Sequence, residues 1–191
     1  CCPRRLSRRP TTSATPPQSG PQPQAGAQQP PLVVNIQYVK DLSFEVPGAP
    51  LIYTQLHQPP RVDINLDVQV HRVVETQQSF EVTLSIRAEA TEAPANAQAS
   101  DSVRGPRVFL AELAYSGVFT LNGVPEQAVE PTLLVECPRL LFPFARNLLA
   151  DITREGGFAP VFLQPIDFVA LWQQRRQQAA AAGAASVAGN A

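Results

Sequence analysis

The sequence has few of the residues that usually carry chemistry. Its 191 residues include three cysteines, two histidines and no methionine. Neither His57 nor His71 has cysteine or carboxylate partners at metal-ligand spacing, and no glycine-rich phosphate loop is present. Cys137 has no base identified beside it, so a buried structural thiol is favoured over a nucleophile. These features predict no enzyme, no metal site and no cofactor.

Other absences concern location. Without methionine the printed chain does not begin at an ordinary initiator, which we attribute to processing, truncation or an extended gene model. A lipid-tethered protein beginning at Cys1 is the alternative. No run of about 18 apolar residues exists, the start lacks the apolar stretch of a secretory signal, and the cysteines form no disulfide framework. We therefore expect a cytoplasmic protein that does not insert into membranes.

Charge is unevenly distributed along the chain. All 16 acids lie between Asp41 and Asp167, where residues 32–173 hold nine Lys and Arg, a formal charge of −7 for this stretch. The remaining six basic residues are arginines outside it. An acidic body disfavours nucleic acid and anionic membranes as partners and favours a basic protein.

Composition divides the chain into three parts. Residues 1–31 carry eight of the 20 prolines and no acid, so burial cannot offset the entropy of ordering them, and we expect a disordered Pro/Gln-rich extension. Residues 32–176 can bury one core of ordinary size and form a single domain. Residues 177–191 are rich in alanine and predict a flexible tail in which helix frays.

Four strand candidates precede two helix candidates. Apolar patterning predicts strands within Gln37–Pro50 and over residues 62–71, 80–89 and 108–121. Helical spacing predicts a helix over residues 139–155, with Phe144 on its buried stripe, and a second helix capped by Asp167. The short link between the second and third strands requires antiparallel pairing. The predicted fold is α+β, a four-stranded antiparallel sheet with two C-terminal helices on one face.

The first and fourth strands carry carboxylates at defined faces. At period two, Asp41 and Glu45 project from one side of the first strand and Phe44 from the other. In the fourth strand, Glu112 shares a face with Leu110. Two acids on a strand most often mark a solvated surface. The alternative is a docking surface for a basic partner.

Two other segments carry more large apolar groups than a small core needs. A proline-flanked link over residues 47–60 carries four of them, Leu51, Ile52, Tyr53 and Leu56. The second helix carries three more, Phe168, Leu171 and Trp172. A fuller core with a subunit interface is one explanation, and an apolar groove for peptides is another; an oligomer can provide both.

Six short sequence blocks follow one another in a characteristic order. They are Tyr38–Glu45, Ile64–Asp67, Val108–Leu113, Gly117–Phe119, Cys137–Arg146 and Pro165–Phe168. Cys137–Arg146 is the most specific of the six, whereas Ile64–Asp67 alone would carry no weight. Together they resemble the SecB protein-export chaperones, and the resemblance covers residues 33 to about 173.

The resemblance implies a SecB-like fold and a cytoplasmic, ATP-independent chaperone that assembles as a homotetramer, a dimer of dimers. Such a chaperone holds unfolded precursor proteins and passes them to the SecA export motor. The residues implied to dock SecA are Asp41, Glu45, Leu110 and Glu112. Those implied to line client grooves are Leu51, Ile52, Tyr53, Leu56, Val62, Ile64, Leu66, Phe168, Leu171 and Trp172. A SecB-like chaperone of a toxin–antitoxin pair is the alternative.

The chain departs from the family pattern in three places. The proline-rich head is not a family feature, and the C-terminal tail is rich in alanine and slightly basic. His57 stands where many relatives carry tryptophan. The first two departures concern the ends of the chain, and the third concerns the apolar link implied to line a groove.

Overall fold

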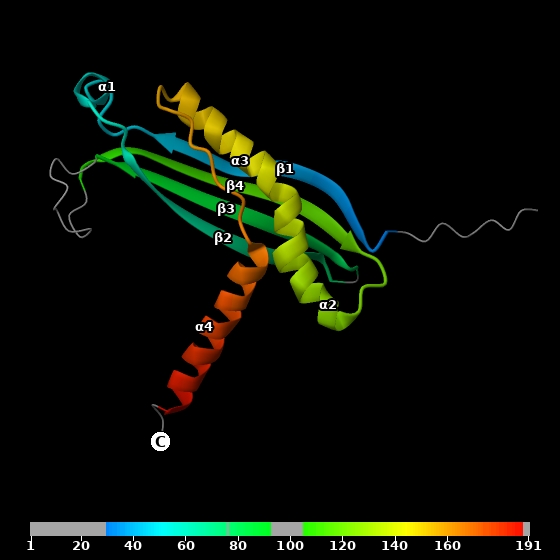
Figure 1. Ribbon diagram of the computed structural model, residues 1–191. Helices are drawn as coiled ribbons and strands as arrows, with labels where there is room; N and C mark the ends of the chain where they lie inside the picture. The colour runs from blue at the N-terminus through cyan, green and yellow to red at the C-terminus, as the bar shows by residue number, and fades with distance from the viewer. Residues whose placement is uncertain (1–29, 76, 93–104, 189–191) are drawn as a thin grey trace, which may run out of the picture.

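The computed structural model describes residues 30–75, 77–92 and 105–188 (Figure 1). Most of the predicted Pro/Gln-rich extension, residues 1–29, falls outside these ranges, as do residues 93–104 between the third and fourth strands. The strands are β1 (Leu32–Glu45), β2 (Arg61–Val74), β3 (Ser79–Thr91) and β4 (Arg107–Leu121). The helices are α1 (Ile52–Gln55), α2 (Glu126–Pro131), η1 (Thr132–Glu136), α3 (Cys137–Glu155) and α4 (Phe168–Ala188).

The strands form one antiparallel sheet in the order β1-β4-β3-β2, which confirms the predicted α+β class. β2 and β3 form the predicted hairpin, and β4 returns to lie between β3 and β1. Because side chains alternate across a strand, the register assigns each residue to one of two faces. Ile86 lies opposite Leu113 on the helix-covered face, and Arg87 lies opposite Glu112 on the helix-free face.

β1 is longer than the predicted first strand and irregular. Its register shifts between Val34 and Ile36 and again between Val39 and Asp41, so the alternation of side chains is interrupted twice. This explains why the sequence alternates cleanly only from Asp41 onward. β1 is also an edge strand, so that Ile36 and Val39 are 56% and 43% exposed.

A continuous helical rod covers one face of the sheet. The helix predicted over residues 139–155 is its last part, because the rod begins at Glu126 and passes through the π-helical turn η1. Pro138 stands at the start of α3, where a missing amide hydrogen costs little. Pro143 lies inside α3 with its ring on the exposed side. The predicted helix start at residue 139 is therefore too late, because the rod already begins at Glu126.

The main core lies between the sheet and α3. Leu141, Ala145 and Leu149 are fully buried at the spacing i, i+4, i+8. Phe144 was wrongly predicted to be on this stripe and is 50% exposed, because each helical residue is rotated about 100° from the last. Its ring stacks on Tyr115 at the margin of the core, with 6.1 Å between ring centroids.

The second predicted helix begins where expected. The Asp167 carboxylate accepts hydrogen bonds from the amides of Val169 and Ala170, at 2.9 and 3.1 Å, and so caps α4. Phe168 is buried against the core, but from Gln173 onward the described side chains are mostly exposed. Figure 1 shows α4 projecting from the body.

The prediction that both helices lie on one face holds for α4 only in its first turns. The sequence after Trp172 is Gln-, Arg- and Ala-rich and offers no apolar stripe to bury. Helix nevertheless continues through residue 177 to Ala188, because alanine and glutamine favour it. Arg175 fastens α4 to the sheet edge. It donates a hydrogen bond to the carbonyl oxygen of Val68 at 3.1 Å and forms an ion pair with Asp67.

Candidate functional site

The helix-free face gathers the residues implied to form a docking surface. In the β1–β4 register, Glu45 lies opposite Leu110 and Asp41 lies opposite Ala114. Glu112 occupies the position between Leu110 and Ala114 on the same face. The Glu112 side chain is 42% exposed, whereas Leu110 is 5% exposed. Three carboxylates, Asp41, Glu45 and Glu112, therefore share one face of two neighbouring strands, with the apolar Leu110 beside Glu45 and Glu112.

Arg87 on β3 lies within this face and was not singled out from the sequence. It forms ion pairs with Glu112 and, at 3.5 Å, with Glu89. Glu89 also accepts a hydrogen bond from Arg107 at 3.0 Å, which is the main reason its pKa lies below the usual 4.5. The docking surface is therefore not purely acidic. The strict alternation of β3 placed Arg87 on this face, but its partner is known only from the β3–β4 register.

A second polar cluster braces the same face near the middle of the sheet. The Tyr38 hydroxyl donates to Glu81, and the Lys40 ammonium donates to the same carboxylate at 2.9 and 3.0 Å. The Tyr38 bond is the main cause, with Lys40 next, of a Glu81 pKa below 4.5, and it raises the pKa of Tyr38 above 10.0. Since Tyr38 pairs with Ser116 in the register, its side chain reaches across β4.

Beneath this bridge lies a buried pair of hydroxyls. Thr83 and Ser116 are hydrogen-bonded at 2.8 Å and are only 4% and 0% exposed. They lie on the helix-free face, where most side chains meet solvent. Their burial shows that neighbouring side chains cover this part of the helix-free face and shield the hydrogen bond from water.

The apolar link over residues 47–60 folds onto one end of the sheet. Within it the short helix α1 directs Ile52, 6% exposed, into a second core cluster with Ala90, Val108 and Phe109. Leu51, by contrast, is 63% exposed. α1 is therefore the element that anchors the link to the sheet.

Tyr53 and Leu56 form the outer part of the link. Tyr53 is 48% exposed, stacks on Phe158 with 5.4 Å between ring centroids, and donates its hydroxyl proton to the carbonyl of Gly156 at 2.9 Å. Leu56 is half-buried against the second cluster. Phe158 was missed from the sequence, although a large aromatic directly after Gly156-Gly157 could have marked it.

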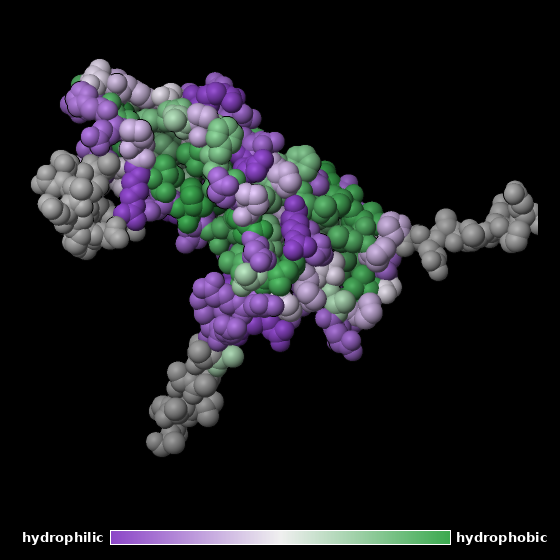
Figure 2. All heavy atoms as spheres, in the orientation of Figure 1, coloured by the Kyte–Doolittle hydropathy of each residue, from purple (hydrophilic) through white to green (hydrophobic). Residues whose placement is uncertain are grey.

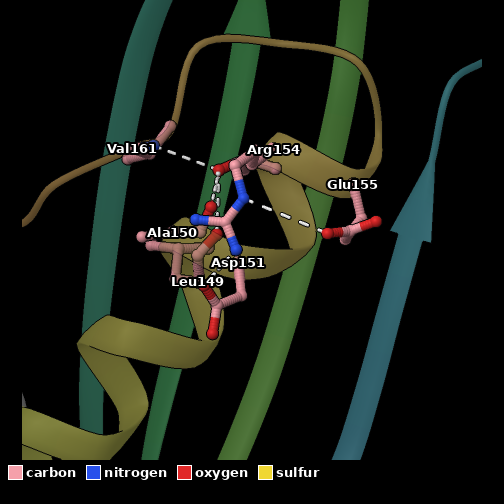
Figure 3. Close-up of polar contacts among 7 residues, drawn as sticks. Leu149, Ala150, Asp151, Arg154, Glu155 and Val161 are labelled. Atoms are coloured by element: carbon pink, nitrogen blue, oxygen red, sulfur yellow. Dashed lines mark hydrogen bonds and ion pairs between the residues drawn. The ribbon is translucent and has the colours of Figure 1, made fainter.

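The chain leaving α3 is tied back to that helix (Figure 3). The amide of Val161 donates to the buried Thr153 hydroxyl at 3.0 Å, and this hydroxyl donates to the carbonyl of Leu149 at 2.9 Å. On the outer side Arg154 pairs with Asp151 at 2.8 Å. These bonds hold the segment between α3 and α4 in place, with Phe158 against Tyr53.

The base of α4 forms the other part of the implied groove. Leu171 and Trp172 are half-buried against the main core, and the Trp172 indole nitrogen donates to Glu130 at 3.1 Å. The guanidinium of Arg176 lies 5.1 Å from the centre of the Trp172 ring. Trp172 is thus held by its hydrogen bond to Glu130 and by the Arg176 cation over its ring, and the rest of the side chain packs against the main core.

A hollow of about 550 Å³ lies next to Trp172's partner Glu130. Its other lining residues are Val70, Arg72, Gln78, Val124, Glu126, Val129, Leu133 and Leu134. Figure 2 shows apolar surface on this side of the molecule, between the elements that cover the sheet and at its α2 end. The residues of α2 and η1 that line the hollow were missed because the helix was predicted to start later.

The structure divides the implied groove residues into two groups. Four lie at the α1 end, Leu51, Ile52, Tyr53 and Leu56, with Val62 beside them. Three lie at the base of α4, Phe168, Leu171 and Trp172. On β2 between these groups, Ile64 is 40% exposed and Leu66 is half-buried. Ile52 and Phe168, 6% and 1% exposed, are core residues in this arrangement and support the surface without forming it.

The remaining groups to consider are the Cys137 thiol, clusters of metal-binding side chains and long apolar helices. Cys137 is fully buried, as expected of a structural thiol, and burial raises its pKa to about 12. Among residues 30–75, 77–92 and 105–188 no cluster of three or more His, Cys, Asp or Glu could hold a metal ion. None of the helices in those ranges is long and apolar enough to cross a membrane. Fold and surfaces together define an α+β binding protein.

Comparison with known proteins identifies the family. The family model for preprotein translocase subunit SecB matches residues 25–179. Protein-export protein SecB of Granulibacter bethesdensis is 60% identical over 167 residues, which cover 87% of this chain and 90% of the relative. That of Acidiphilium cryptum is 63% identical over 151 residues, covering 78% and 90%. The chain belongs to the SecB family.

A solved structure supports the fold independently. The SecB-like chaperone Rv1957 of Mycobacterium tuberculosis, in complex with a ChAD peptide from the Rv1956 HigA1 antitoxin, matches with a TM-score of 0.54. The match covers 71% of this chain and 90% of that one at 16% sequence identity. At this identity the likeness shows a shared fold, which agrees with the SecB-like architecture expected from the sequence.

Proposed function

We propose that this chain is an ATP-independent export chaperone that holds unfolded precursor proteins and delivers them to SecA. The observation that carries this proposal is the match to the SecB family over residues 25–179, together with relatives named protein-export proteins at 60% and 63% identity. The chain acts by binding, without catalysis, and works in the cytoplasm.

SecA docks on the helix-free face through Asp41, Glu45, Leu110 and Glu112. Support for this role comes from the register, which gathers three carboxylates on one face of β1 and β4, with Leu110 beside Glu45 and Glu112. Such a surface complements a basic partner, and charge complementarity favours fast association and correct partner choice. Because this surface lies on the face opposite the helices, SecA docking there leaves the client-binding surface free.

Clients bind on the helix-covered side, along apolar surface that extends from α1 to the base of α4. Support comes from the exposed Leu51, Tyr53 and Ile64, from the half-buried Trp172, and from the hollow of about 550 Å³ beside Glu130. Apolar contacts do not depend on a particular sequence, so many weak contacts along an extended chain add up to tight holding.

The working assembly is a homotetramer, a dimer of dimers. Support comes from large apolar side chains that one copy leaves exposed on the edge strand β1 and on the outer side of α3, namely Val34, Ile36, Val39, Leu42, Leu140 and Phe144. Isolated apolar residues at a surface are ordinary, but groups of them usually mark an interface.

The alternative task, chaperoning a toxin–antitoxin pair, has weaker support. The SecB-like chaperone bound to an antitoxin peptide shares 16% identity with this chain, whereas the export proteins share 60% or more. A pull-down that recovers an antitoxin and no SecA would favour this alternative over export.

The proposed function is tested by three measurements on the purified chain. We expect light scattering to give a tetramer, the chain to slow the refolding of an unfolded precursor without ATP, and calorimetry to detect SecA binding. A monomer that leaves refolding unchanged contradicts the proposal.

Glu112→Lys separates the two proposed surfaces. We expect SecA affinity to fall roughly tenfold, because charge reversal removes an attraction and adds a repulsion of similar size. Client holding should be unchanged. The matched control is Glu155→Lys, at the end of α3, whose side chain is 80% exposed. Equal loss of SecA binding and client holding in Glu112→Lys would indicate misfolding and reject the separation of the two surfaces.

A further inference from the structure

Arg87 has an unusual position on the helix-free face. It lies opposite Glu112 of β4 and Asn65 of β2 in the sheet register, so it stands near the middle of the four strands. Its side chain is 44% exposed and pairs with Glu112, the residue proposed to meet SecA, and with Glu89. A carboxylate of the docking surface is therefore already paired with a cation of the same chain.

Two shallow hollows flank Arg87. One, of about 280 Å³, is lined by Asp41, Asp67 and Glu112, and the other, of about 390 Å³, by Asp63 and Glu89. Arg87 lines both, and the other charged residues lining them in the described chain are carboxylates. These hollows could receive side chains of a cationic segment, but the guanidinium of Arg87 lies between them.

We propose that Arg87 is an intramolecular competitor that occupies Glu112 and must release it when a lysine- or arginine-bearing segment of a partner protein docks. Arg87 thereby lowers the affinity of the docking surface for cationic segments. This role rests on the proposed docking function of the helix-free face and adds a regulatory residue to it.

The geometry makes this competition reversible. Glu112 and Arg87 are both more than two-fifths exposed, so water and salt screen their attraction and the pair separates at little cost. Glu89 offers Arg87 a second carboxylate on the same strand and face, at 3.5 Å. Arg87 can therefore leave Glu112 without losing every partner. A buried pair would instead hold Glu112 permanently.

The test measures binding of a fluorescent decalysine peptide, and of full-length SecA, by anisotropy in low salt. Arg87→Gln should tighten decalysine binding roughly two- to fivefold, the range expected for one exposed ion pair. In a Glu112→Gln background the same substitution should have a smaller effect, because the competition for Glu112 has been removed and only that for Glu89 remains. The gain should also shrink as salt is raised to about 0.5 M.

Arg139→Gln is the matched control, because Arg139 is 48% exposed and pairs with Glu136 at 3.0 Å on the helical rod. It should leave both affinities unchanged. Decalysine binding that is equal, weaker or absent in Arg87→Gln, or an equal gain in the Glu112→Gln background, overturns the role of Arg87. If decalysine follows the expected order but SecA does not bind, the SecA proposal fails and the competitor role stands.

Discussion

The two faces of the sheet differ although the same strands make both. On β3, Val82, Leu84 and Ile86 are at most 1% exposed beneath the helical rod, while their neighbours Ser85 and Arg87 face the other side. The helix-covered face supplies stability through burial, and the helix-free face presents charged side chains to solvent. A slip of one residue in register would exchange the two sets, so burial of one face also fixes which charges the other presents.

Truncating a side chain under the rod should give the largest effect. Leu141→Ala removes most of a fully buried side chain and leaves a cavity, which should lower the free energy of unfolding by about 2–5 kcal/mol. Urea unfolding followed by circular dichroism measures the change. Leu51→Ala is the control, because Leu51 is 63% exposed and should cost far less. Equal losses would show that the rod does not pack as described.

The helix-free face should be less sensitive, except at its buried hydroxyls. Ser116→Ala leaves Thr83 without its partner and should cost about 1–3 kcal/mol in the free energy of unfolding. Adding Thr83→Val removes the stranded hydroxyl and should recover part of the loss. Urea unfolding of both variants gives the comparison. A double variant less stable than Ser116→Ala would mean that packing, and not the hydrogen bond, keeps the pair.

The smallest expected effect concerns pH and the Tyr38–Glu81–Lys40 cluster. Because its hydrogen bonds lower the pKa of Glu81, this carboxylate stabilises the folded state above pH 4.5, and the contribution is lost as pH falls through its folded pKa. Glu81→Gln should therefore lower stability by less than about 1 kcal/mol at pH 7 and by nothing at low pH.

Thermal unfolding from pH 7 down to pH 3 checks this prediction. Glu155→Gln is the control, since its side chain is 80% exposed and should give a flat difference from the unmodified chain. A difference for Glu81→Gln that grows as pH falls would contradict the assignment, because it would mean that the neutral acid is the stabilising form.

Much of the fold could be predicted because local pattern and final packing agree. β2 and β3 alternate regularly over residues 62–71 and 80–89, so their antiparallel pairing follows from the sequence, although β2 runs on to Val74 past a register shift after Arg72. The helical rod was cut short because the predicted helix starts only after Pro138, whereas the rod already contains Pro131 and accommodates Pro143 at an exposed position. The irregular start of β1 was missed because bulges break the period.

The candidate surfaces could be predicted only in part. Alternation places Asp41 and Glu112 on faces of their own strands, and the register that joins them comes from β4 returning to pair with β1. The partner of Arg87 depends on that long-range pairing too. Burial of Ile52 and Phe168 could not be distinguished from exposure in a groove, because both outcomes require the same apolar residue types.

The bond from Arg175 to the main-chain oxygen of Val68 has a consequence for aggregation. β2 ends the sheet, and an uncovered edge strand is a template on which a strand of another molecule can add. With Arg175 bonded to Val68 and paired with Asp67, the middle of this edge carries a charged side chain instead of free backbone. The base of α4 therefore also hinders the addition of strands from other molecules to β2.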